Sequence, residues 1–501
     1  MDQPEFDYEI VAPRPGPMIE SLRSIGYDLP TALADLVDNS IAARAQHVWL
    51  DFHWSGAASH IALADDGQGM SEVELVSAMR LGDRSPTEER DPRDLGRFGL
   101  GLKTASFSQC RIVTVASKCA GQTTLRRWDL DAVVASSEWR LQKPEELPSA
   151  VLAPLQSYDS GTVVIWEKLD RLTAGSSVAD EDAHDFFLKQ ADEVRHHLAM
   201  VFHRFLEPPS QLKIYVNGNQ VRHWDPFLTA EPATRLLADE ALNLFGRRIN
   251  VRPYVLPHHS KASADTYDRA AGPRGWYSQQ GFYVYRNKRL LVAGDWLGLG
   301  LHKAEHYKLA RIMLDIPNTM DAYWDIDVKK SRATPPASLR RDLKRLAILT
   351  RNEASAVYKH RGARLAPNRT ELILLWLSKV KHGKYYYEIN REHPLVSALL
   401  VACGNREAKH IRVLLSVLEQ TVPVPTIVVN AAEAPDGLVA PFSNATDALR
   451  SALELSYKVL VESGSAPHDA RLRLLSMEPF SQFPEVVMAL NDSQIESELP
   501  Q

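Results

Sequence analysis

The stretch DLPTALADLVDNSIAARA, residues 28–45, constrains the fold more than any other part of the sequence. Asp28 can cap a helix, and Pro30 suits the first turn of one. Apolar side chains recur at helical spacing and predict a buried face, made of Leu33, Leu36, Val37 and Ile41. Asp35 and Asn39 are four residues apart, so they share another face of the same helix. The pattern predicts a helix that packs on a core and turns two polar side chains into a cleft.

The two polar residues suggest a chemistry for that cleft. A carboxylate can activate a water molecule, and an amide oxygen can ligate Mg²⁺, so we assign the first role to Asp35 and the second to Asn39. Such a pair taken alone is more often a solvated helix face. Asp38 is a less suitable base because it adjoins Asn39, and we expect it to hold a neighbouring side chain or a glycine loop.

A second motif, Asp65-Asp66-Gly67-Gln68-Gly69-Met70, directly follows an apolar strand pattern. An acid at a strand end can accept a hydrogen bond from an exocyclic amine such as that of adenine. The glycines let the backbone turn and approach a flat ring. A plain turn between strand and helix is the alternative, and the spacing does not complete a calcium-binding loop.

A third motif, GRFGLGLKT at residues 96–104, is rich in glycine and precedes a predicted helix. Exposed N–H groups, the positive helix end and Lys103 together suit a phosphate. The motif is neither GxxxxGK[ST] nor preceded by the short strand of a dinucleotide-binding unit. A fourth motif, residues 160–162, opens another strand, and Thr162 can hydrogen-bond a base.

Taken in order, the four motifs resemble those of the GHKL ATPases, the group of gyrase, the related heat-shock chaperones, MutL and the MORC proteins. The segments GFYVYRNKRLL and WDIDVKKSRATPP are similar to the transducer domain of the MutL and MORC branch. The whole pattern resembles bacterial MORC or MutL-like ATPases linked to restriction and phage-defence gene clusters. The resemblance covers about residues 15 to 340.

This resemblance implies ATP and Mg²⁺ as ligands. It assigns the metal to Asn39 and the adenine amine to Asp65. The remaining nucleotide-binding set that it implies is Gly67, Gly69 and Met70 beside the base, Gly96, Gly99, Gly101, Lys103 and Thr104 at the phosphates, and Thr162 near the adenine. A transducer lysine, Lys330 in preference to Lys329, would reach the terminal phosphate. Related proteins usually carry Glu where Asp35 stands, so we expect slow hydrolysis.

The expected fold class is α+β, with a Bergerat-type α/β sandwich, a ribosomal-protein-like transducer and a mainly helical C-terminal region. The predicted divisions are an arm at 1–14, the ATP-binding domain at 15–208, the transducer at 209–337 and the C-terminal region at 338–501. A hairpin at 211–221 is expected to begin the second domain, and residues 281–292 to form one strand. From residue 338 the pattern predicts helix to about residue 378.

Composition limits the classes of partner and metal site that we expect for this chain. The 501 residues include 58 Lys and Arg against 63 Asp and Glu, so no global charge favours nucleic acid. Residues 340–369, however, carry nine basic and two acidic side chains, and such a helix could follow a phosphate backbone. Three cysteines without a CxxC pair indicate neither a disulfide framework nor a zinc site. The absence of a signal or membrane-spanning pattern predicts a cytoplasmic protein.

The expected function is an ATP-gated clamp. ATP would order a lid between Gly82 and Arg97 together with the N-terminal arm, and two chains would then form a homodimer. Partner proteins encoded in a defence cluster would act with it. A scaffold that closes on ATP with negligible hydrolysis is the alternative, and a histidine kinase is disfavoured because no phospho-acceptor helix precedes the ATP-binding motifs.

Overall fold

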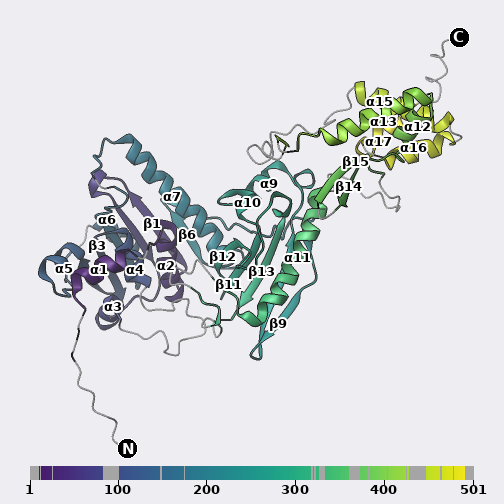
Figure 1. The fold of residues 1–501 in the computed structure, drawn as a ribbon. Helices are drawn as coiled ribbons and strands as arrows, with labels where there is room; N and C mark the ends of the chain where they lie inside the picture. Colours follow the sequence, from purple (N-terminus) through teal and green to yellow (C-terminus); the bar gives the residue numbers. More distant parts are fainter. Residues whose placement is uncertain are drawn as a thin grey trace, which may run out of the picture. The chain divides into compact units, whose positions relative to one another are not determined.

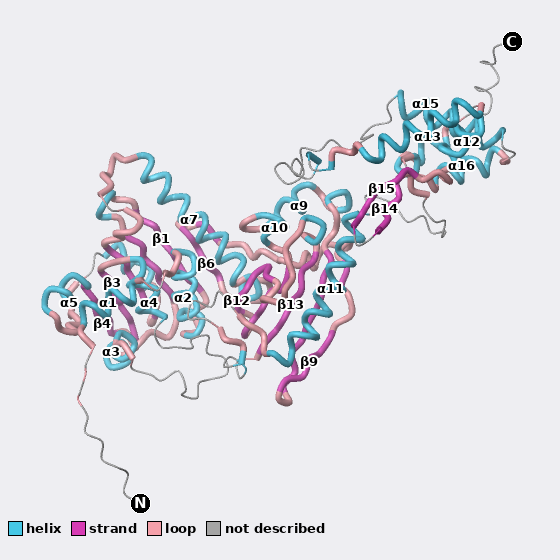
Figure 2. Tube along the Cα trace, viewed as in Figure 1, coloured by secondary structure: helices cyan, strands magenta, loops and turns pink. Residues whose placement is uncertain are grey.

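The computed structural model is shown in Figures 1 and 2. It describes residues 9, 11, 13–24, 26–82, 101–146, 149–173, 175–317, 320, 323–326, 333–359, 373–381, 384–402, 404–424, 426–427, 447–462, 465–477 and 479–490. The chain divides into two compact units, Met1–Lys359 and His360–Gln501. Helices and strands are both abundant in the first unit, which confirms the predicted α+β class.

A seven-stranded sheet forms the framework of the first domain, in the order β4-β3-β5-β2-β1-β6-β7. Alternation of buried and accessible residues along β1 reflects one face that packs on the core. The strands are β1 (His47–His53), β2 (His60–Asp65), β3 (Ile112–Cys119), β4 (Gln122–Asp129), β5 (Gly161–Glu167), β6 (Lys213–Val216) and β7 (Asn219–Gln220). All neighbours are antiparallel except β1 and β6, which are parallel.

The β6–β7 hairpin corrects one expectation. The predicted hairpin forms, and its turn lies at Asn217 and Gly218, with φ of 46° and 74°. It pairs with β1, however, and therefore completes the first sheet instead of beginning the second domain. The first sheet thus extends to Gln220, beyond the predicted boundary at residue 208. A crossover connection that carries a long helix allows this parallel return.

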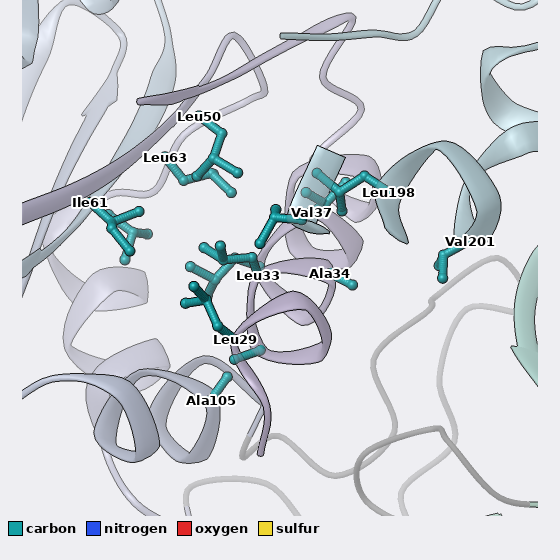
Figure 3. Packing of buried hydrophobic residues seen from close by; sticks show 14 of the residues in the cluster. Leu29, Leu33, Ala34, Val37, Leu50, Ile61, Leu63, Ala105, Leu198 and Val201 are labelled. Atoms are coloured by element: carbon teal, nitrogen blue, oxygen red, sulfur yellow. The ribbon is translucent and has the colours of Figure 1, made fainter. Parts of the chain in front are cut away.

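Helices cover the core face of this sheet, and α2 lies at their centre. They are α1 (Pro15–Arg23), α2 (Leu29–Ala42), α3 (Glu72–Met79), α4 (Gly101–Gln109), α5 (Leu130–Ser136), α7 (Glu181–Val201) and α8 (His203–Leu206). A short turn, η1 (Gly56–Ala58), joins β1 to β2. Figure 3 shows Leu33 and Val37 of α2 facing sheet residues such as Leu63, with Leu198 of α7 beside Val37. On the opposite face, α6 (Ser149–Gln156) packs Leu155 against Val163.

A second sheet follows in the order β12-β11-β13-β10-β8, and β9 pairs with β10. Its strands are β8 (Arg235–Leu236), β9 (Glu240–Leu244), β10 (Arg247–Val255), β11 (Gly281–Arg286), β12 (Arg289–Asp295) and β13 (Ala310–Ile316). Residues 281–292 were predicted as one strand but form the β11–β12 hairpin. The reason is that Asn287 and Lys288 both adopt positive φ, 48° and 68°, which closes a two-residue turn.

Short helices and one long helix complete the second domain. They are η2 (His259–Lys261), α9 (Ala264–Ala271), α10 (Gly275–Ser278), η3 (Glu305–Tyr307) and α11 (Ala337–Lys359). Helix α11 buries Leu339, Leu343 and Leu346 in the core of the second sheet. It therefore packs as part of this domain, although residues from 338 onward were predicted to belong to the C-terminal region.

The unit His360–Gln501 is mainly helical, as predicted. It contains β14 (Trp376–Lys381), β15 (Lys384–Ile389), α12 (Pro394–Ala402), α13 (Asn405–Gln420), α15 (Asp447–Glu462), α16 (Pro467–Leu475), η5 (Phe480–Gln482) and α17 (Pro484–Met488). Leu453, Tyr457 and Leu474 lie in its core. The helix predicted to continue to about residue 378 is wrong at its end, because β14 begins at Trp376 and pairs with β15. No helix in the described parts of the chain is both long and apolar enough to span a bilayer.

The core around α7 gives a direct test of the fold. Leu198 is 0% exposed and Leu188, on the same helix, is 44% exposed. Leu198→Ala should lower the free energy of unfolding by about 2–5 kcal/mol, because it leaves a cavity in a packed core. Leu188→Ala should lower it by roughly 1 kcal/mol or less. Urea denaturation followed by circular dichroism compares the two; equal losses would contradict the packing described here.

Candidate functional site

Helix α2 presents the polar face that the sequence predicted. Asp28 Oδ1 accepts a hydrogen bond from the N–H of Thr31 at 2.9 Å and so caps the helix start. Asp35 is only 2% exposed, whereas Asn39, one turn later, is exposed. The helix therefore buries its carboxylate and leaves its amide accessible to a ligand.

The carboxylate of Asp35 is held from its own domain. The hydroxyl of Tyr27 donates to Asp35 Oδ2 at 3.0 Å, and Tyr27 is itself buried. A Cβ built on Gly101 would lie 3.8 Å from the same Oδ2 atom, which places the start of α4 beside the acid. The first and third sequence motifs thus meet at Asp35.

Asp65 ends β2 in a pocket of hydrogen-bond donors. Its Oδ2 accepts from Ser40 Oγ at 2.8 Å, and its Oδ1 accepts from the N–H of Gly67 at 2.9 Å. Burial raises the pKa of Asp65 to about 6, and these two hydrogen bonds oppose that rise. Thr162 on β5 is the register partner of Asp65. The second and fourth motifs therefore meet here.

The glycines after Asp65 are required by close backbone approach. Gly69 has φ of 68°, and a Cβ there would lie 1.9 Å from the carbonyl oxygen of Lys118. A Cβ on Gly67 would lie 2.8 Å from both Ala43 Cβ and Asp65 Oδ1. Any other residue would push these segments apart, so the turn can form only with glycine at both positions.

Ser117 joins the motif to the neighbouring strands. The N–H of Met70 donates to Ser117 Oγ at 2.8 Å, and that oxygen lies 3.0 Å from Thr162 Oγ1. Sequence reasoning missed both Ser117 and Ser40. Ser40 directly follows Asn39 and is 1% exposed, but only the packing of α2 against the end of β2 shows that it faces Asp65.

The glycine-rich motif is described from Gly101 onward, and Gly96 and Gly99 lie outside the described residues. Gly101 is the first described residue of α4, and it lies next to Asp35, so the N-terminal end of this helix faces the acid. Lys103 is 3% exposed, and its Nζ donates to the carbonyls of Ala78 at 3.0 Å and Arg80 at 2.8 Å. Its ammonium would have to leave these carbonyls to contact a phosphate. Thr104 is wholly buried.

The structure describes only part of the predicted basic segment at 340–369 and neither of the two candidate transducer lysines. Lys329 and Lys330 lie outside the described residues, as do residues 360–369. Along α11, Arg345 pairs with Glu240 at 2.5 Å, and Arg351 lies over the ring of Tyr307 at 3.9 Å. These arginines hold the helix to its own domain, so fewer of its charges are free for a phosphate backbone.

Asp38 holds a neighbouring side chain, as expected, and that side chain comes from the second domain. Asp38 is 1% exposed, and its Oδ1 accepts from Arg289 Nε at 3.3 Å. Arg289 Nη2 also lies 4.0 Å from Asp35 Oδ1. Sequence reasoning missed Arg289, because one arginine in a hairpin carries no local signal of a contact so distant along the chain.

The arrangement fits a magnesium ion shared with a ligand. Among the described residues, no group of three or more His, Cys, Asp and Glu side chains could hold a metal by itself. Mg²⁺ bound to nucleotide phosphates, however, needs only one or two protein oxygens. The exposed amide of Asn39, one turn after Asp35 on α2, can supply one.

Comparisons with known proteins give a family model, a curated relative and a solved structure that are similar to this chain. Residues 27–162 match the family described as histidine kinase-, DNA gyrase B-, and HSP90-like ATPase. The chain is 30% identical over 129 residues to ATPase morc-1 of Caenorhabditis elegans, an overlap of 26% of this chain and 14% of that protein. The ATPase and transducer domains of DNA topoisomerase II from Balamuthia mandrillaris align with a TM-score of 0.36 and 13% identity, over 66% of this chain and 85% of theirs.

The environment of Asp65 predicts a pH effect on stability. Burial raises its pKa from 3.8 to about 6, so between these values the folded chain keeps a proton that the unfolded chain releases. The free energy of unfolding should therefore fall as the pH rises from about 4 to about 6, by at most about 3 kcal/mol, and change no further above it.

Asp65→Asn provides the reference, because an amide can accept from Gly67 and donate to Ser40 but does not titrate. The difference in urea stability between wild type and Asp65→Asn should shift against the wild type from pH 4 to pH 7. A difference independent of pH would show that Asp65 titrates normally.

Proposed function

We propose, from the premise that residues 27–162 are a GHKL ATPase domain of the histidine kinase, DNA gyrase B and HSP90 type, that this chain binds Mg-ATP and hydrolyses it slowly. The observation that carries the proposal is the convergence of all four sequence motifs. Asp35 and Gly101 lie together, and Asp65 and Thr162 pair across two strands. Helix α2 links the two groups, because its Ser40 donates to Asp65, and its Asn39 is exposed.

Asp65 would recognise the adenine. Above pH 6 its carboxylate is ionised and can accept a hydrogen bond from the exocyclic amine of the base. Ser40 and the N–H of Gly67 hold the carboxylate in one orientation. Backbone at Gly67 and Gly69, which has no side chain to obstruct it, would form the wall beside the ring, with Met70 and Thr162 nearby.

The phosphates would bind at the start of α4. The N-terminal end of a helix attracts negative charge, and Gly96, Gly99, Gly101, Lys103 and Thr104 are the residues proposed to surround the phosphates. A magnesium ion at Asn39 would neutralise phosphate charge when bound. Lys330, in preference to Lys329, is proposed to reach the terminal phosphate from the second domain.

Asp35 would act as the general base. Its buried carboxylate is oriented by Tyr27, so it can take a proton from a water that attacks the terminal phosphate. Asp is one methylene shorter than Glu, and misplacement of the base reduces the rate. Asp35 is also only 2% exposed, so little room is left for an attacking water beside its carboxylate. Both features favour slow turnover.

At the level of the whole chain, we propose a cytoplasmic clamp that dimerises on ATP. The proposed lid and N-terminal arm would order around the nucleotide and close two chains on each other. The clamp would act with partner proteins in DNA-related defence, and residues 340–369 are the candidate DNA contact. These assignments are supported by the motif resemblance alone.

A second candidate is an ATP-gated scaffold that binds ATP but hydrolyses almost none. The observation that favours it is the short Asp35 side chain in a site with little access for water. Both candidates require the same nucleotide contacts, so only turnover separates them.

Asp35 variants test the proposal. Wild type should release phosphate from Mg-ATP, and Asp35→Ala should lower kcat by about 10²–10⁴-fold while ATP still binds, because only the base is removed. Asp35→Glu should retain turnover. Asp51→Asn, at an exposed position on β1, is the control and should match the wild type. Steady-state phosphate release and calorimetric ATP binding give the readouts. If wild type and both Asp35 variants match the protein-free blank while ATP binds, the scaffold is correct.

If the chain is an ATP-gated clamp, its mass in solution should double when nucleotide binds. Light scattering coupled to size exclusion should show a monomer without nucleotide and a dimer with Mg²⁺ and a non-hydrolysable ATP analogue. Asp65→Asn should stay monomeric at the same analogue concentration, because the amide presents a donor to the adenine amine. A mass unaffected by nucleotide in the wild type would count against the clamp.

A further inference from the structure

Arg289 reaches from the second domain into the nucleotide-binding helix of the first. It is the first residue of β12 and directly follows the tight turn at Asn287 and Lys288. Its Nε lies 3.3 Å from Asp38 Oδ1, and its Nη2 lies 4.0 Å from Asp35 Oδ1. One guanidinium therefore spans two carboxylates on neighbouring turns of α2.

The surroundings leave the guanidinium little freedom. Arg289 is 3% exposed, its Nη1 donates to the carbonyl of Leu290 at 2.5 Å, and its charge lies 5.5 Å from the centre of the Phe202 ring. Within the described residues its Nη2 makes no hydrogen bond. Burial lowers the pKa of the neighbouring His197 to about 4, with a smaller contribution from the charge of Arg289. His197 is therefore neutral at pH 7 and adds no positive charge beside Arg289.

A buried arginine with an unpaired donor lowers the stability of the fold. Its presence here therefore favours a role for this side chain at its position. Here the unused Nη2 faces Asp35, the proposed base, and lies just beyond hydrogen-bond distance. Because Arg289 begins the edge strand of the second sheet, a small shift of that strand moves the guanidinium relative to α2. The contact can therefore transmit the position of the second domain to the hydrolytic helix.

We propose that Arg289 is a positioning residue for ATP hydrolysis: it holds the Asp35 and Asp38 face of α2 and makes turnover depend on the seating of the β11–β12 hairpin. The proposal rests on the proposed ATPase function. It assigns Arg289 no contact with ATP, so substrate affinity should not depend on it.

A second ion pair between the same domains provides a matched control. Arg204 of α8 contacts Asp315 of β13, with Nη1 to Oδ1 at 2.5 Å and Nη2 to Oδ2 at 3.1 Å. Its charge also lies over the Tyr285 ring at 4.4 Å. This pair joins the domains away from α2. Loss of Arg204 should therefore weaken the same interface without disturbing Asp35.

The experiment uses the full chain and compares Arg289→Met with Arg204→Met. Arg289→Met should lower kcat for ATP by about 10–100-fold and leave KM within about threefold, because the base is misplaced while nucleotide contacts remain. Arg204→Met should leave kcat within about threefold. Thermal unfolding reports whether each variant folds, and calorimetry reports ATP binding.

Two further variants guard against a simple folding defect. Arg289→Lys keeps a charge near Asp38 but loses the branched donor group, so its kcat should lie between wild type and Arg289→Met. Asp38→Asn should also lower kcat, and the double variant Arg289→Met/Asp38→Asn should be no slower than the slower single variant, because both changes break one interaction.

Equal losses of kcat in Arg289→Met and Arg204→Met would overturn the proposal and leave Arg289 as an ordinary interface residue. Wild-type turnover in Arg289→Met and Arg289→Lys would overturn it as well, while the ATPase function stood. If the wild type itself binds ATP without turnover, the hydrolytic function and this proposal both fail, and that outcome is read from the wild type alone.

Discussion

Buried carboxylates on α2 and at the end of β2 are the constraint on which the first domain depends. Asp35, Asp38 and Asp65 are each at most 4% exposed, and a buried carboxylate without partners would destabilise the fold by several kcal/mol. Each therefore needs a donor. Tyr27 supplies one from the segment before the helix, Ser40 from the helix itself, and Arg289 from 251 positions beyond Asp38.

The position of these donors determines how the larger elements assemble. Helix α2 must lie against the sheet so that Ser40 reaches Asp65, and the β11–β12 hairpin must meet α2 so that Arg289 reaches Asp38. Gly69 lets the turn after Asp65 pass close to the carbonyl of Lys118, which no side chain would allow. Packing of the two domains and the shape of the proposed nucleotide cleft therefore depend on the same contacts.

Local patterns predicted the local elements well. The apolar stripe, the Asp28 cap and the polar face of α2 could be predicted because each depends on neighbouring residues. The β6–β7 hairpin was predicted as a hairpin but assigned to the wrong sheet, because its pairing with β1 is a contact over more than a hundred residues. The split of residues 281–292 into two strands was missed because Asn287 and Lys288, unlike Asn-Gly, give a weak turn signal.

In the candidate site, too, local motifs predicted some residues, whereas others are evident only from tertiary contacts. The resemblance named Asp35, Asn39, Asp65 and Thr162, and the structure brings Asp65 and Thr162 into register on adjacent strands. Ser40, Ser117 and Arg289 escaped prediction because their roles arise from tertiary contacts between polar residues with no distinctive spacing. The assignment of Lys103 to phosphate remains a prediction, since its ammonium now binds the carbonyls at the end of α3.

We propose that α2 and the end of β2 together form a nucleotide site. A crystal structure with Mg²⁺ and a non-hydrolysable ATP analogue tests it most directly. We expect Asn39 within bonding distance of the metal and Asp65 hydrogen-bonded to the adenine amine. A nucleotide bound elsewhere, or a cleft that keeps both side chains out of contact with the ligand, would contradict it.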